Sequence, residues 1–315
     1  MPLPTALDVQ PIDPILTNML LAFAQADSRF VAARAFANVP VDKDNGTYII
    51  LTKKYWFLDE MKPRAYGDKY SRAGYGVSSS TYQTLQYALA HPLADETRAN
   101  SQVPMDLEEV ALRWLAQQSL IRKERDFATT AFSSGVWTTN TTVSNKWSDY
   151  AASDPVGDLR TSGRTISQLT GLRPNTLVMG EIVDDRLQNH PDIIDRLKYT
   201  QSATAAAIQG AMAALFGLEN YLVSAAVYNS ANEGQAFSGS AIIDDDALLC
   251  YTNPGAGIFG ATAGKIFYWE PGGGMGGVRS YYDDDSDATI LKQKEQWDMK
   301  VIAADLGDLM ADCVD

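Results

Sequence analysis

The chain has 315 residues and a formal net charge of −13 at pH 7, with 45% hydrophobic and 21% charged residues. This length is sufficient for one large core or two smaller ones, and the composition is that of a globular rather than a disordered protein. The negative charge excludes a protein that grips nucleic acid electrostatically, because phosphate neutralisation requires an excess of Lys and Arg. An acidic wall is nevertheless suited to enclosing nucleic acid without adhering to it.

Histidine and cysteine are too scarce for the common metal and nucleophilic sites. The chain has only two of each, and Cys250 and Cys313 lie far apart. This excludes a disulfide framework and a multi-histidine metal site, and it favours a buried structural thiol at Cys250, inside the apolar run 247–251. No stretch approaches the ~18 apolar residues of a membrane-spanning helix, and the first residues lack a secretory pattern. We therefore expect a cytoplasmic product without membrane association.

The N-terminal third is predicted to be extended. A short amphipathic helix over 15–25 is followed by a strand over 47–51, which begins after the turn Asp44-Asn45-Gly46. Residues 59–104 then form a long excursion rich in Gly, Ser, Tyr, Arg and Lys, in which residues 80–89 alternate as in a strand. Such a segment has little apolar surface to bury on itself. Two interpretations remain open: a surface loop, or an arm that becomes ordered on a neighbouring subunit.

A long helix is predicted over about 106–132. Asp106 and Glu109 have the spacing of a capping box at its start, and at ~1.5 Å per residue the helix would be about 40 Å long. Six apolar residues share one helical stripe, namely Leu107, Val110, Ala111, Trp114, Leu115 and Ile121. The charged cluster Arg122–Asp126 interrupts this stripe, and we expect it to be a solvated or inter-subunit face.

The second half predicts alternating helices and strands around a second core. A polar turn region over 133–153 leads to a helix that is capped by Asp154, has Pro155 at its first position and ends at Gly171. The elements expected after it are, in chain order, strand 176–179, helices 181–189, 191–199 and 204–216, and strands 221–227, 247–251, 265–269, 278–282 and 288–304.

Two motifs of other protein classes are incomplete. Gly255–Gly260 has the spacing GxGxxG, but a strand rather than a helix is predicted after it, so the dinucleotide-binding context is missing. Asp283–Asp287 spaces its acids as in a calcium loop, but Ala288 replaces the required glycine and Lys294 stands where the bidentate glutamate belongs. We therefore assign no catalytic, cofactor-binding or metal-binding residue and expect no cofactor.

The region 155–235 resembles a known family. The segments that carry the resemblance are GLRPNTLVMG at 171–180, RLKY at 196–199, LFGLE at 215–219 and VYNSANEG at 227–234. They resemble the major capsid proteins of tailed bacteriophages with the Hong Kong 97-type fold. The order of predicted elements is similar to that family over nearly the whole chain.

The resemblance implies an α+β fold with an N-terminal arm, an extended β-hairpin loop, a long spine helix in a peripheral domain, and an axial domain near the capsomer symmetry axis. The corresponding parts would be the arm at 1–45, the extended loop with flanking strands at 46–104, the peripheral domain with the spine helix at 105–154, the axial domain at 155–280, and C-terminal strands returning to the peripheral domain at 281–315.

The resemblance also implies a function. The chain would self-assemble into hexamers and pentamers that form the icosahedral head of a virion, assembled in the bacterial cytoplasm, and would enclose double-stranded DNA without sequence-specific binding or catalysis. The expected partners are further copies of the chain, a separate scaffolding protein and a portal protein, with a decoration protein as a further candidate. Two alternatives remain open: an encapsulin-like nanocompartment with protein cargo, and a soluble α/β enzyme or binding domain that would be a stable monomer.

Charge asymmetry suggests which residues meet a neighbouring subunit. Residues 158–315 carry 22 acidic and 11 basic residues, a balance of −11, whereas residues 1–157 carry 17 and 15, a balance of −2. Basic and aromatic residues of the excursion and of the long helix could therefore meet the acidic half of a neighbour. The candidate inter-subunit contacts are Arg64, Tyr66, Lys69, Tyr70, Arg72, Arg122, Lys123 and Arg125.

Overall fold

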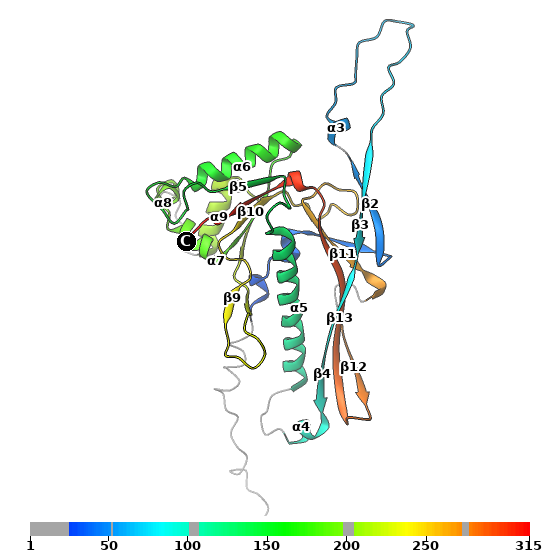
Figure 1. Ribbon diagram of the computed structural model, residues 1–315, viewed down its shortest axis with the longest axis vertical. Coiled ribbons are helices and arrows are strands. Elements are labelled where there is room, and N and C mark those ends of the chain that lie inside the picture. The colour runs from blue at the N-terminus through cyan, green and yellow to red at the C-terminus, as the bar shows by residue number, and fades with distance from the viewer. Residues whose placement is uncertain (1–24, 52, 101–106, 198–204, 273–276) are drawn as a thin grey trace, which may run out of the picture.

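Figure 1 shows a computed structural model of the protein, which describes residues 25–51, 53–100, 107–197, 205–272 and 277–315. Two mixed sheets and one long helix form the body, and a long hairpin extends away from it (Figure 1). The helix expected over 15–25 lies outside the described residues except at its last position. No helix in the described part of the chain has the length and hydropathy needed to cross a membrane.

The first sheet is organised around one long strand, β13. This strand is antiparallel to three others, and β1 extends the sheet by pairing in parallel with β11. Tyr87 stacks on Trp297 across the sheet, with ring centroids 4.2 Å apart. The strands are β1 (Ala37–Val41), β4 (Leu85–Ala94), β11 (Gly264–Trp269), β12 (Gly277–Asp283) and β13 (Ala288–Val301).

The protruding hairpin is formed by β2 (Asn45–Leu51) and β3 (Val77–Gln83). Between them, the described residues contain one short helix, α3 (Lys53–Trp56), followed by irregular chain (Figure 1). Residues 80–89 are strand as expected except at Thr84, where β3 ends and the chain changes partners. The Thr84 amide donates to the Asp44 carbonyl at 2.8 Å, and β4 then pairs with β13 instead of β2.

The long helix is confirmed as α5 (Leu107–Ala131), and it packs along β13 and β4. Its expected apolar stripe is only partly correct. Ala111 and Leu115 are buried, but Trp114 is 43% exposed. The charged cluster is not simply a solvated face either, since Glu124 is fully buried within it. A carboxylate can lie there because backbone amides satisfy it, as described below.

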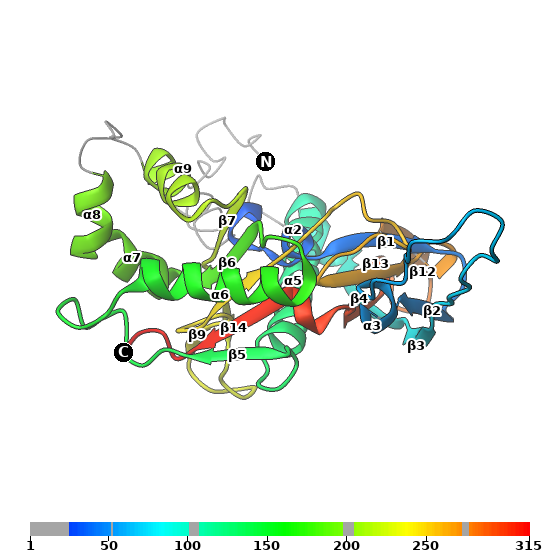
Figure 2. The same cartoon turned by 90° about the horizontal axis from the view of Figure 1, so that it is seen from above.

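The second sheet lies beside α5 and carries four helices (Figures 1 and 2). Its strand order is β5–β14–β10–β6–β7. The strands are β5 (Thr139–Thr142), β14 (Gly307–Ala311), β10 (Ala247–Cys250), β6 (Thr176–Gly180) and β7 (Asn220–Ser224), and the helices are α6 (Pro155–Thr170), α7 (Glu181–Gln188), α8 (Pro191–Leu197) and α9 (Ala205–Phe216).

The helix boundaries of this region follow the expected local signals. The Asp154 carboxylate accepts a hydrogen bond from the Gly157 amide at 2.9 Å, and Pro155 occupies the first helical turn of α6. Gly171 ends α6 with φ of 75°, and Gly217 follows α9 with φ of 71°. These are left-handed conformations that glycine adopts without strain. The capping predictions for α6 are therefore confirmed.

Three features of the second half differ from the expected elements. The strand expected over 221–227 is interrupted at residues 225–226 and continues as β8 (Val227–Asn229), which pairs with β9 (Gly239–Ala241). The terminal strand β14 was not expected, and neither was β5 within the polar region 133–153.

The expected boundary at residue 280 also differs from the division between the sheets. Strand β11 belongs to the first sheet, whereas β14 pairs with β10 in the second. Strand pairing over this range depends on residues far apart in the chain, which a local pattern does not encode. The short remaining elements are η1 (Asp27–Arg29), α2 (Ala32–Ala35), α4 (Asp95–Ala99), η2 (Glu270–Gly272) and η3 (Ala304–Leu306).

The two sheets share buried apolar residues. One cluster joins Phe127 of α5 and Trp297 of β13 with Val178 and Leu248 of the second sheet. A second cluster lies between the second sheet and its helices and includes Leu177, whose side chain is fully buried. The body of the subunit is thus held together by a core that spans both sheets. The hairpin of β2 and β3 packs on a separate small cluster near its base, where Tyr48 lies against Phe267.

Candidate functional site

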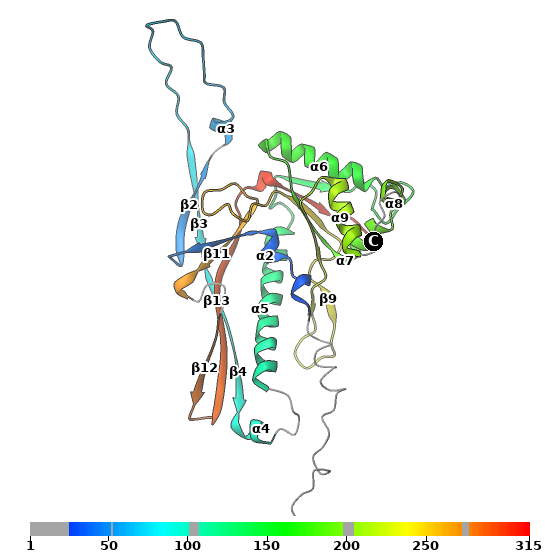
Figure 3. The ribbon, with the colours of Figure 1, turned by 180° about the vertical axis from the view of Figure 1, so that it is seen from behind.

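The segment between β2 and β3 is the most unusual surface of the subunit. It stands clear of the body in two opposite views (Figures 1 and 3). Its large apolar and aromatic side chains are exposed, namely Tyr55, Trp56, Phe57, Leu58, Met61, Tyr66, Tyr70, Tyr75 and Val77. We call residues 53–77 the apical loop. Soluble monomers seldom expose so many large apolar groups in one segment, and such surfaces mark sites of association.

Five candidate contact residues lie in this apical loop. The Arg64 guanidinium lies over the Tyr70 ring, 4.1 Å from its centroid, and donates a hydrogen bond to the Asp68 carbonyl. Tyr66 is fully exposed, and Lys69 and Arg72 are exposed as well. The structure thus brings Arg64 and Tyr70 together, and it leaves the charged and aromatic groups of the loop accessible to another molecule.

The three candidates on α5 are placed differently. Lys123 is only 13% exposed and forms an ion pair with Glu295 of β13 at 2.5 Å. Arg122 pairs with Asp126 at 2.6 Å, and its guanidinium lies 5.0 Å from the centroid of the Tyr87 ring. The third candidate, Arg125, lies over the Tyr228 ring at 4.5 Å. All three side chains therefore have partners within their own subunit.

Sequence reasoning did not single out Glu124, which joins three parts of the fold. Its carboxylate accepts hydrogen bonds from the amides of Val31 and Ala32, both at 3.0 Å, and from the Ser224 hydroxyl at 2.8 Å. These groups belong to the start of α2, which lies beside α5 (Figure 3), and to the end of β7. Burial raises the pKa of Glu124, and the three hydrogen bonds oppose that effect.

The helical spacing of Glu124 relative to the apolar residues of α5 could have indicated that its carboxylate is buried. Glu124 precedes Phe127 by three positions and Ala131 by seven, and all three are buried on α5. An acidic residue at such spacing faces the core, and it must then find hydrogen-bond donors there.

The remaining reactive groups are buried or lie in turns. Cys250 is fully buried, as expected, and burial raises the pKa of its thiol to about 11, which disfavours a reactive thiolate. The Gly255–Gly260 motif lies in turns between β10 and β11 and precedes a strand. Asp283 begins the hairpin turn between β12 and β13, where its carboxylate accepts from the Ser286 hydroxyl at 2.7 Å. Among the described residues, no group of three metal-ligating side chains could hold an ion.

Comparison with known proteins gives a consistent class. No family model matches the chain. The chain is 24% identical over 223 residues to the major capsid protein of Burkholderia phage BcepMu. The matched region covers 69% of this chain and 70% of the relative. Its structure resembles a phage-related protein from Bordetella bronchiseptica RB50, with a TM-score of 0.70, 23% identity, and coverage of 96% of this chain and 97% of that one.

It also resembles the capsid of cyanophage P-SCSP1u, with a TM-score of 0.56, 9% identity, and coverage of 88% of this chain and 86% of that one. At these identities the structural likeness establishes the fold, which is the mixed helix-and-sheet fold of phage capsid subunits. Within that class, the chain is similar in sequence to the BcepMu major capsid protein, in agreement with the resemblance found in its sequence.

Proposed function

We propose that the chain is the major capsid protein of a bacteriophage, a structural rather than catalytic component of the virion. It self-assembles into hexamers and pentamers that tile an icosahedral head around double-stranded DNA. The observation that carries this proposal is the apical loop, whose aromatic residues are exposed in the single subunit. The sequence relative supports the capsid function over an encapsulin-like compartment and over a soluble enzyme.

The apical loop has a physical reason to lie on a neighbouring copy. Phe57 is 66% and Tyr75 70% exposed, and the two-stranded hairpin that carries them offers little surface on which to bury them. Burial on another subunit yields ~25 cal/mol per Å² of apolar surface. The exposed Arg64, Lys69 and Arg72 add positive charge that complements the acidic second half of a neighbour.

The fold details belong to the same proposal. We assign the first sheet with α5 to the peripheral domain of a Hong Kong 97-type subunit, and the second sheet with α6–α9 to the axial domain. Residues 1–45 serve as the arm and α5 as the spine helix. The acidic chain encloses DNA without sequence-specific contacts, and a scaffolding protein, a portal and a decoration protein are the further partners.

The test is assembly of the purified chain, followed by light scattering and negative-stain microscopy, alone and with its scaffolding protein. We expect capsomers or shells from the wild type. The Phe57→Ser variant is expected to lower the assembled fraction about tenfold or more, because it removes an anchor that only a neighbour can bury. Particles purified from infected cells distinguish the two kinds of shell. Packaged DNA indicates a viral head, and a protein cargo indicates a nanocompartment.

The matched control is Phe237→Ser, which removes an equally large side chain, 75% exposed, that stands singly in the connection between β8 and β9 rather than within a run of exposed aromatic residues. This variant is expected to assemble as the wild type does. A wild-type chain that stays monomeric at high concentration with its scaffolding protein contradicts the proposed function. Unchanged assembly of Phe57→Ser contradicts the role of the apical loop.

A further inference from the structure

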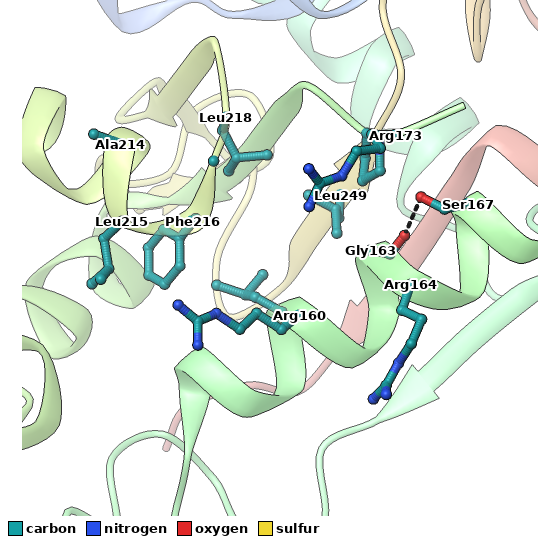
Figure 4. Close-up of a pocket in the computed structure, with 13 residues that line it drawn as sticks. Arg160, Gly163, Arg164, Ser167, Arg173, Ala214, Leu215, Phe216, Leu218 and Leu249 are labelled. Carbon is teal, nitrogen blue, oxygen red and sulfur yellow. Dashed lines mark hydrogen bonds between the residues drawn. The ribbon is translucent and has the colours of Figure 1, made fainter. Parts of the chain in front are cut away.

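An open groove of about 730 Å³ lies on the second sheet's outer side, between α6 and the turn that follows α9 (Figure 4). Its floor is apolar and includes Leu159, Phe216 and Leu249. Three arginines are the charged residues of its lining, and the lining contains no Asp or Glu. The groove is therefore shaped and charged for an acidic group.

Two of these arginines face the groove. Figure 4 shows the guanidinium groups of Arg160, on α6, and Arg173, before β6, directed over the apolar floor, whereas Arg164 points away from it. Among the described residues, no ion pair joins a carboxylate to any of the three. Arg presents a planar fork of donors that matches a carboxylate, so unpaired guanidinium groups above an apolar floor favour a carboxylate partner from outside the subunit.

A surplus of carboxylates lies at the other end of the same sheet. Asp244, Asp245 and Asp246 form the turn between β9 and β10, and Asp312 follows β14 beside them. Burial raises the pKa of Asp246, and the neighbouring carboxylates of Asp245, Asp312 and Asp244 raise it further. Among the described residues, the ion pairs near this turn involve one cation, Lys146, which pairs with Asp312 at 2.8 Å. We call residues 244–246 the acidic turn.

The groove and the acidic turn are held apart by β6. The strand begins at Thr176, just after the groove residues Arg173 and Pro174, and it ends at Gly180, which lies directly against the backbone of Asp244. Five residues at ~3.3 Å each separate the two ends by roughly 15 Å. Because both features sit on one rigid sheet, they cannot meet within a subunit. They can meet between two copies of the chain.

We propose that the Arg160–Arg173 groove of one copy binds the acidic turn of the adjacent copy within a capsomer. This inference rests on the proposed function, and it specifies the partner and the chemistry of one contact. Two different patches at opposite ends of one domain make a heterologous contact, which repeats from copy to copy and closes into a ring. Opposite charges on the two patches also fix the direction in which copies join, since two grooves or two acidic turns repel.

Charge reversal tests the pairing. The R160E/R173E variant and the D244K/D245K variant are each expected to lower the fraction of chain in capsomers about tenfold or more. Asp246 is left in place because its carboxylate accepts from the Asp312 amide. A chain that carries all four substitutions has the charges exchanged and is expected to regain assembly. Circular dichroism and thermal unfolding check that each variant is folded.

The matched control is Arg164→Glu, which makes the same kind of charge change on the same helix but at a side chain directed away from the groove (Figure 4). It is expected to assemble normally. A mixture of the two double variants provides a second measurement. When the two variants alternate around a ring, each groove meets a turn of opposite charge. Every contact is then satisfied in a ring of six, whereas a ring of five has one contact between like charges. Six-membered rings are therefore expected to predominate in micrographs of the mixture.

The outcomes separate this contact from the proposed function. If both the wild type and R160E/R173E form normal capsomers, the proposed contact is contradicted and the proposed function is not. Normal shells of that variant with less packaged DNA also overturn it, because the groove would then bind phosphate. Loss of assembly in both double variants without recovery in the four-substitution chain overturns it as well. A wild-type chain that never assembles contradicts the function itself.

Discussion

The apical loop and the second sheet use their apolar residues in opposite ways. Every residue of β6 and of β10 is buried, between α6 on one side and the shared core on the other. In the apical loop, large aromatic side chains are exposed on a two-stranded hairpin. The first region is stabilised within one subunit, whereas the second leaves its apolar surface exposed, and we propose that another molecule buries it. A capsid subunit of this kind must fold alone and still keep apolar surface for assembly.

The largest expected difference between the two regions is in the free energy of unfolding of two leucine-to-alanine variants. Leu177→Ala in β6 removes a fully buried side chain, and it is expected to lower the free energy of unfolding by about 3 kcal/mol. Leu58→Ala in the apical loop removes the same atoms from a site that is 56% exposed, and it is expected to change that free energy by less than about 0.5 kcal/mol. Urea denaturation of the unassembled subunit measures both.

In capsomer assembly, the apical-loop variant of this pair is expected to have the direct effect. Leu58→Ala is expected to weaken capsomer formation, since the proposed contact with a neighbour would bury the side chain that the subunit leaves exposed. A loss of unfolding free energy at Leu58 comparable to that at Leu177 would mean that the apical loop packs on its own subunit, and the contrast between the two regions would fail.

A smaller effect distinguishes the basic residues of α5 from those of the loop. Lys123→Ala leaves Glu295, whose side chain is 5% exposed, without its cation, and is expected to cost about 2 kcal/mol of unfolding free energy. Arg72→Ala, at an exposed position of the apical loop, is expected to cost less than about 0.5 kcal/mol. Thermal unfolding compares the two variants. Equal stability of Lys123→Ala and the wild type would show that the Lys123–Glu295 pair contributes nothing within the subunit.

The smallest expected effect is a pH dependence at Glu124. Its pKa is raised in the folded subunit by burial, so the folded state holds the proton more tightly than the unfolded chain does. The contribution of that proton to stability is fully present below the unfolded value of about 4.3 and is lost as the pH rises through the folded pKa. Glu124→Gln cannot titrate, so its stability should lack this pH-dependent contribution.

Denaturation of the wild type and of Glu124→Gln at several pH values from about 4 to 8 measures the difference. We expect the wild type to lose stability relative to Glu124→Gln as the pH rises through this range. A relative stability that stays constant, or that moves in the opposite direction, would show that the hydrogen bonds from Val31, Ala32 and Ser224 outweigh burial.

Much of the fold was predictable where its signals are local. The cap at Asp154, the proline at 155 and the glycine at 171 define α6 within single turns of chain. The extent of α5 agrees with its apolar period, whereas its expected cap, Asp106, lies outside the described residues. Strand β5 was missed because its polar residues, Thr139–Thr142, carry no alternation of apolar side chains. Helical spacing puts Trp114 on the apolar stripe of α5, but spacing alone does not say how much of each side chain on that stripe is covered, and Trp114 stays 43% exposed.

The candidate contact residues divide in the same way. Composition identified the apical loop as a segment that cannot bury itself, and its candidates are indeed exposed. The candidates on α5 looked similar in sequence, but Lys123 finds its partner Glu295 more than 170 positions away. Arg160 and Arg173 were not singled out, because the groove that they line forms only when α6, α9 and β6 are packed together.

The sequence by itself determined the class of the protein, most of its helices and strands, and the presence of an apolar segment without a partner. These depend on capping residues, on hydrophobic periods and on composition, which act over a few neighbouring residues. Only the tertiary structure decided that β14 joins β10, that Glu124 holds the start of α2, and that a basic groove and an acidic turn lie at opposite ends of one sheet. Such contacts join residues far apart in the chain, and their energy exists only once the backbone has brought them together.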